Sequence, residues 1–134
     1  MKRGNTLKRL IMIGLALLLL TACGREIHEN ISEEMVEDTE QIISIFDETI
    51  KEDRELSNKE VKTFERYKIK YETKKENPEV YPEGFSEEEI RLYGLTDVMI
   101  DDYDRIVTLS SDHEDYETQR DRLYRVIETG KIDK

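Results

Sequence analysis

The stretch LSNKEV, residues 56–61, contains a complete start signal for a helix. The Ser57 side chain can accept a hydrogen bond from the amide of Glu60, and the Glu60 carboxylate can reach back to the Ser57 amide, which makes a capping box. Leu56 and Val61 occupy the two positions of the hydrophobic staple around such a box. We therefore expect a helix that begins directly after Ser57.

A second stretch, FSEEEI at residues 85–90, repeats the arrangement. Ser86 and Glu89 form the box, and Phe85 and Ile90 form the staple. The sequences that follow the two boxes do not align, so the repeat is local start chemistry and does not indicate an internal duplication. A further helix is expected from Ser86 onward.

Upstream of the first box, apolar residues recur at three- and four-residue steps and predict an amphipathic helix over about 31–53. Asn30 with Glu33 resembles a capping box and predicts the start of this helix. Ile45 lies off its apolar stripe. The stripe itself consists of Met35, Val36, Thr39, Ile42, Ile43, Phe46 and Ile50.

The helix that follows Ser57 is expected to run to about Glu76, because the proline of Asn77-Pro78 has no amide and restricts the residue before it. Its apolar side is thin and its other face is mostly Lys and Glu. We expect this to be the least buried helix, or one that needs a partner. The apolar side comprises Val61, Phe64 and Tyr71.

The segment 85–109 is rich in apolar residues, and Gly94 divides it. Either Gly94 ends a short helix and Thr96 caps the next one, or one helix runs through at a cost of about 1 kcal/mol relative to Ala. A last helix is expected from 110–111 to Gly130. Its apolar residues are Tyr116, Leu123, Tyr124 and Ile127.

Four or five amphipathic helices with mostly short connections predict an all-α fold, a small antiparallel bundle over residues 31–134. No alternating strand pattern of useful length is found. Six of the tyrosines fall mostly near the apolar stripes, which favours the rim of the core over a ligand cage. These are Tyr67, Tyr71, Tyr93, Tyr103, Tyr116 and Tyr124.

The beginning of the chain is typical of an export signal. Residues 1–9 carry four basic and no acidic side chains, and residues 10–20 are uncharged. Eleven helical residues rise about 16 Å, roughly half of the hydrocarbon thickness of a bilayer, which is short for a transmembrane span. An export signal is therefore the expected role of this segment.

The residues Leu20-Thr21-Ala22-Cys23 resemble the lipobox of bacterial lipoproteins. The resemblance implies that the signal peptide 1–22 is removed and that Cys23, the only cysteine, is diacylated and becomes the first residue. Residues 23–30 would then be the lipidated cysteine and a short tether, and the domain would lie on the extracytoplasmic face of the cell membrane. The alternative is an uncleaved apolar anchor with an incidental cysteine.

The charge balance excludes several partners. The whole chain has a formal charge of −11, and loss of the four basic residues of 1–22 leaves 17 basic and 32 acidic residues, a formal charge of −15. A domain this acidic will not seek nucleic acid or anionic lipid by charge. The lipid anchor is therefore the expected link to the membrane.

No motif predicts an enzyme, a cofactor or a metal site. His28-Glu29 and His113-Glu114 each begin like a zinc-protease helix, but neither has a second histidine four residues later. An EF-hand loop that starts at Asp102 fails at its sixth and twelfth positions. The many carboxylates guarantee accidental pairs, so no pair of them indicates acid and base catalysis.

The segment 78–85 holds both prolines between two expected helices. Aromatic side chains on a stiff loop make good binding anchors, so Val80, Tyr81 and Phe85 are candidate partner-binding residues. The alternative is that Val80 and Tyr81 fold back as a lid on the end of the bundle.

These features lead to the hypothesis of a membrane-anchored, non-catalytic interaction module that binds another envelope or membrane protein. A narrower version is an exclusion or immunity factor that blocks the entry of phage or conjugative DNA. Two alternatives remain open: a lipoprotein that binds a small ligand or a cation, and a structural envelope protein that associates with itself. The sequence leaves the oligomeric state undetermined.

Overall fold

The two capping boxes begin helices where the sequence predicts them. In the computed structural model, the amides of Glu60 and Glu89 donate to the Oγ atoms of Ser57 and Ser86 at 3.2 and 3.0 Å. Both glutamate side chains also accept the amide of their own serine, so both boxes are complete. The satisfied amides fix where each helix starts.

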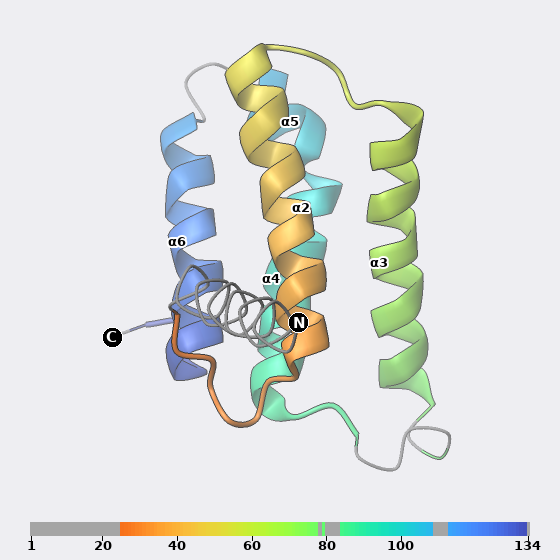
Figure 1. Cartoon of the computed structure of the whole chain (residues 1–134), viewed down its shortest axis with the longest axis vertical. Coiled ribbons are helices and arrows are strands. Elements are labelled where there is room, and N and C mark those ends of the chain that lie inside the picture. The colour runs from red at the N-terminus through yellow and green to blue at the C-terminus, as the bar shows by residue number, and fades with distance from the viewer. Residues whose placement is uncertain (1–24, 78, 80–83, 109–112, 134) are drawn as a thin grey trace, which may run out of the picture.

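The structure describes residues 25–77, 79, 84–108 and 113–133, and this part of the chain forms helices and no strands. The all-α bundle predicted from the sequence is confirmed. Long helices that follow one another in the chain run in opposite directions (Figure 1). The helices are α2 (Glu33–Glu52), α3 (Asn58–Glu76), α4 (Glu87–Asp101), α5 (Tyr103–Thr108) and α6 (His113–Thr129).

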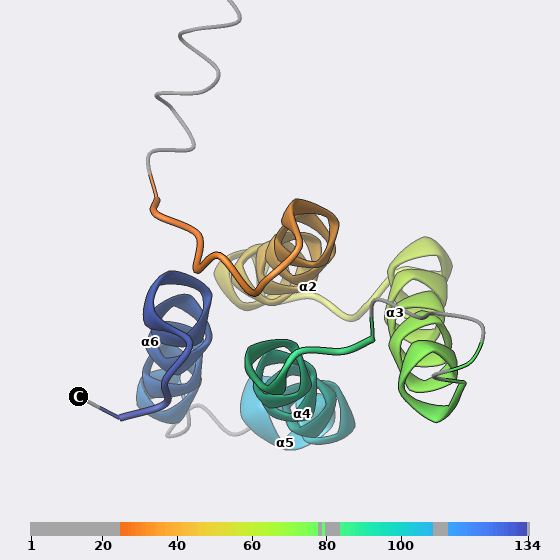
Figure 2. The same ribbon diagram turned by 90° about the horizontal axis from the view of Figure 1, so that it is seen from below.

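Seen along the bundle, α2, the α4–α5 pair and α6 surround a common interior, and α3 packs beside α2 and α4 on the side away from α6 (Figure 2). In the orientation of Figure 1, α2 begins at the lower end of the bundle and finishes at the upper end. The lower end also holds the start of α4 and the finish of α6. The upper end holds the α2–α3 corner and α5.

The interior is mostly aliphatic around α6 and aromatic toward α3. Leu123, Val126 and Ile127 of α6 are fully buried. Phe46 of α2 lies between three rings, with centroid distances of 5.6 Å to Phe64, 5.0 Å to Tyr103 and 5.3 Å to Tyr116. Five of the six tyrosines expected near the core are buried. The sixth, Tyr124, is partly buried against the same cluster.

Helix α3 ends at Glu76 as predicted, but its buried side is different from the predicted one. Phe64, Tyr67 and Tyr71 are buried, whereas Val61 is 38% exposed. Ion pairs hold both flanks of α3 to its neighbours, since Lys68 binds carboxylates of α4 and Lys70 binds carboxylates of α2. The acidic partners are Asp97, Asp101, Glu34 and Asp38.

Two predictions for α2 are wrong. Its N-cap is Ser32 and not Asn30, because the Ser32 Oγ accepts the amide of Met35 at 3.3 Å. Ile45 is buried, because α2 has neighbours on several sides and therefore buries a wider arc than one stripe.

The open question at Gly94 is also answered. Helix α4 continues through Gly94, and the helical path is interrupted later, at Asp102. A Cβ atom added at Gly94 would meet no atom within 4 Å. The continuous alternative is therefore the correct one.

Candidate functional site

The chain before α2 lies on the lower end of the bundle. We call residues 25–31 the docked segment. The amide of His28 donates to the carbonyl of Ile127 in α6 at 2.7 Å. The Arg25 guanidinium carbon lies 3.3 Å from the centre of the Tyr124 ring, and Ile31 is buried. These contacts fix the segment to α6 at Arg25 and His28 and bury its other end at Ile31.

The Ser86–Glu89 box is part of this docking. Glu89 Oε2 accepts both the amide and the hydroxyl of Ser32, at 3.3 and 3.1 Å. Ser86 Oγ donates to the carbonyl of Asn30 at 2.6 Å. Glu89 is only 5% exposed, so its carboxylate satisfies donors that would otherwise be buried without a partner.

At the lower end, the backbone at Gly130 lies close to the side chains of Glu88 and His28. Gly130 has a φ of 73°, and a Cβ atom there would lie 2.7 Å from Glu88 Cγ and 3.2 Å from the His28 ring. Its carbonyl accepts a hydrogen bond from Arg91 at 2.6 Å. Glycine is therefore favoured here both by the left-handed backbone and by the space that Glu88 and the docked segment occupy.

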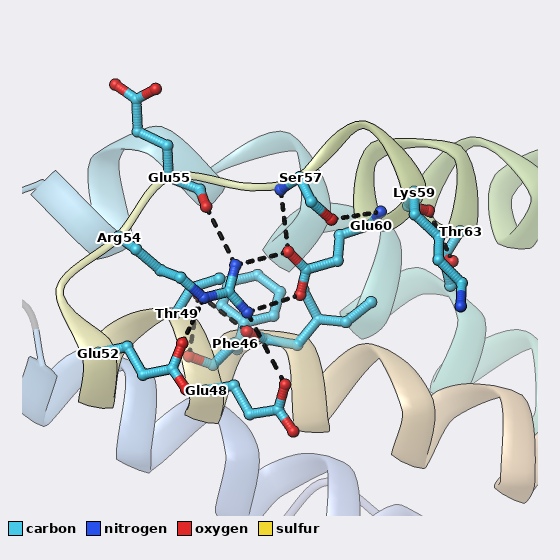
Figure 3. Close-up of polar contacts among 11 residues, drawn as sticks. Phe46, Glu48, Thr49, Glu52, Arg54, Glu55, Ser57, Lys59, Glu60 and Thr63 are labelled. Carbon is cyan, nitrogen blue, oxygen red and sulfur yellow. Dashed lines mark hydrogen bonds and ion pairs between the residues drawn. The ribbon is translucent and has the colours of Figure 1, made fainter.

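At the upper end, Arg54 fastens the α2–α3 corner, as Figure 3 shows. Its Nη1 and Nη2 donate to the two oxygens of Glu60 at 2.7 and 3.1 Å. The same guanidinium binds Glu52 and lies 3.8 Å from Glu48. Nη1 also donates to the carbonyl of Glu55 at 3.1 Å, so one side chain joins the end of α2, the connecting loop and the start of α3.

The ion pair between Arg54 and Glu60 shifts the pKa of Glu60, the carboxylate of the capping box. The hydrogen bonds from Arg54 lower the pKa of Glu60 from its ordinary value of 4.5 to about 2. Partial burial acts in the opposite direction and is outweighed. The Arg54 pKa is raised by the same interaction. The corner therefore keeps its charges through the whole neutral range.

Beside this corner lies an open groove of about 560 Å³ between the α2–α3 connection, the start of α3 and α5. Its apolar wall is formed by Leu56, Val61, Tyr103 and Val107. Its other lining residues are Asp53, Arg54, Glu55, Asp104 and Thr108. Below, "the groove" means this set of nine residues.

One lining residue carries a buried polar group. Tyr103 is only 8% exposed, and its hydroxyl interacts with the Thr49 hydroxyl of α2 without forming a hydrogen bond of good geometry. Burial raises the Tyr103 pKa, so the hydroxyl stays neutral.

The residues that the sequence singled out are placed as follows. Cys23, Val80 and Tyr81 lie outside the described residues. Phe85 is partly buried at the lower end, with its ring centroid 6.0 Å from that of Tyr71 and 6.3 Å from that of Tyr93. It lines a shallow hollow of about 390 Å³ with Lys74 and part of the docked segment. Phe85 and the groove therefore lie at opposite ends of the bundle.

Potential metal ligands are spread out. Within the described residues, no three His, Cys, Asp or Glu side chains are grouped so that they could hold an ion. His28 Nδ1 accepts the amide of Asn30 at 3.2 Å.

None of the described helices is both long enough and apolar enough to span a membrane.

No protein-family model, no curated protein sequence and no solved structure matches this chain. Functional inference therefore depends on the residues of the chain itself. The sequence pattern did not point to the groove, because it assigned Leu56 and Val61 to a staple and Tyr103 to the core rim. The one local signal was Arg54, a lone cation in a short loop that is flanked by carboxylates on both sides.

Proposed function

We propose that this protein is a lipid-anchored extracytoplasmic module that binds another envelope protein without catalysis. The lipobox-like Leu20-Thr21-Ala22-Cys23 supports the anchor. The helical domain with an open, partly apolar groove at one end supports a binding role.

The docked segment is the observation that carries this proposal. Arg25, two positions after Cys23, packs on the Tyr124 ring of α6. Two residues span at most about 7 Å, so an acylated Cys23 would hold the lower end of the bundle against the headgroups. A second acyl chain makes such an anchor stable where one chain is marginal.

The polar groups near the core form hydrogen bonds that join one helix to another. This structural role supports the proposal that the protein is not a catalyst. The Tyr67 and Thr39 hydroxyls bond at 3.0 Å, and Tyr116 donates to Asp47 at 2.6 Å. Burial raises the Tyr67 pKa to about 12, so this phenol stays protonated. These groups fasten helices to one another, as the Glu89 carboxylate does at the lower end.

The anchor is tested by replacing Cys23 with Ser in cells that are fed a clickable palmitate analogue. We expect the native protein to carry the label, to lack residues 1–22 and to fractionate with membranes. The Cys23→Ser variant should lose the label and keep its signal peptide. A native protein without label and with an intact N-terminus would contradict the proposal.

The partner is tested with a photo-crosslinking amino acid at Val61, in the groove, at Phe85, and at the exposed Glu117 of α6 as the matched control. In native membranes we expect one dominant envelope protein from position 61 or 85 and none from position 117. The product should decrease in the Cys23→Ser variant. Equal products from all three positions would contradict a specific binding surface.

A further inference from the structure

We propose that the groove binds a cationic segment of the partner protein through one apolar anchor residue. This inference rests on the proposed function and specifies the chemistry of its partner. The binding surface is the groove at the upper end of the bundle, and the ligand is a cationic segment of another protein.

The apolar wall indicates the anchor. Val61 is 38% exposed on α3, and Leu56 and Val107 are only partly buried beside it. A groove of about 560 Å³ has room for an aliphatic or aromatic side chain. Covering this wall would remove apolar area from water, at about 25 cal/mol per Å².

The rim indicates the charge of the partner. Asp53, Glu55 and Asp104 line the groove, and none of them forms an ion pair within the described residues. Arg54, the cation of the groove, is already engaged with Glu60 and other carboxylates. The unpaired charges at the rim are therefore negative, which attracts a cationic segment and repels an acidic one.

The position of the groove fits a partner that approaches the anchored protein from outside. The docked segment lies at the lower end, and the α2–α3 corner and α5, whose residues line the groove, lie at the upper end (Figure 1). Between them runs α2, whose 20 residues rise about 30 Å. An anchored bundle that stands on its lower end would present the groove at about that height.

The test uses the lipidated mature protein, residues 23–134, in nanodiscs of zwitterionic phosphatidylcholine and fluorescent peptides of sequence KKLKK, EELEE and KKSKK. Fluorescence anisotropy should show that KKLKK binds, and that each of the other two binds at least about tenfold more weakly. Val61→Ser and Asp104→Lys should each weaken KKLKK binding by about tenfold.

Two matched variants serve as controls. Ile69→Ser changes an aliphatic residue of α3 that is 66% exposed, and Glu117→Lys reverses an exposed charge on α6. Both should leave KKLKK binding within about twofold of the native value. Absence of KKLKK binding, equal binding of EELEE, or equal losses in the control variants would overturn the proposal.

These outcomes are separate from those that test the proposed function. Capture of an envelope protein from position 85 together with no KKLKK binding would refute the groove and leave the anchored module intact. Binding of KKLKK, together with a native protein that takes up no palmitate label, would support the groove and refute the anchor.

Discussion

The two capping boxes share one local chemistry, yet they build different ends of the molecule. At the lower end, Glu89 is buried and also accepts the amide and hydroxyl of Ser32, so the box closes onto the docked segment. At the upper end, Glu60 pairs with Arg54 and is partly buried, and the open groove lies beside this pair. The same capping box is therefore covered by the docked segment at the lower end, whereas at the upper end it lies beside a groove that is open to solvent.

The two boxes differ in the additional residue that binds each glutamate carboxylate outside the box. Ser32 is 57 positions from Glu89 in the chain, whereas Arg54 is six positions from Glu60. A long-range partner ties separate elements together, and a short-range partner shapes only a corner. We expect the lower end to be worth more to the stability of the fold and the upper end to be more important for binding.

The largest expected effect is that of Glu89→Ala. Removing this buried carboxylate leaves the amides of Ser32 and Ser86 without their acceptor, and we expect a loss of about 3 kcal/mol in the free energy of unfolding. Urea denaturation measures it. Glu65→Ala, at an exposed position of α3, is the control and should change stability by less than about 0.5 kcal/mol.

Gly130→Ala should cost about 2 kcal/mol, because it combines a left-handed backbone with contact to Glu88 and to His28 of the docked segment. Gly84→Ala is the matched control, since Gly84 has a similar φ of 65° but nothing within 4 Å of an added Cβ. The two variants should differ in stability, and only Gly130→Ala should speed hydrogen exchange at the His28 amide. Equal exchange in both would show that the docked segment does not depend on this approach.

Glu60→Ala should cost about 1.5 kcal/mol at neutral pH, which is less than the cost of Glu89→Ala. Folding lowers the Glu60 pKa from 4.5 to about 2, so its contribution is present above pH 4.5 and is lost as the pH falls toward 2. The stability difference between native protein and variant should therefore shrink over that range. A difference that stays constant down to pH 2 would contradict the Arg54 pair.

Gly94→Ala should give the smallest effect and the opposite sign, a gain of about 1 kcal/mol. Gly94 lies exposed within α4, away from both ends, and has room for a methyl group. Thermal and urea unfolding should both show the gain, and KKLKK binding should not change. A loss of stability would mean that α4 needs flexibility at this position.

The sequence predicted the fold class and the helix starts at Ser57 and Ser86, because capping depends on residues within four positions of each other. It misplaced the start of α2, since two side chains near position 30 can act as caps and only the packing around Ser86 and Glu89 selects Ser32. It also left the path through Gly94 open, because propensity alone does not decide between a break and a cost of about 1 kcal/mol.

The candidate site was harder to predict than the fold. Val61 occupies a staple position in the sequence, but the structure turns it toward the groove and buries Tyr67 instead. The groove depends on how far α5 lies from the α2–α3 corner. The sequence of α5 alone does not determine that separation. The predicted residue Phe85 lies at the other end, against Tyr71 and Tyr93.

Hydrogen exchange of the mature protein with its proposed lipid anchor in nanodiscs, with and without KKLKK, tests the contrast between the two ends most directly. The account predicts that the His28 amide is protected in both states, because it is bonded to Ile127, and that residues 53–61 and 103–108 gain protection only with the peptide. Rapid exchange at His28, or peptide protection at the docked segment in place of the groove, would contradict it.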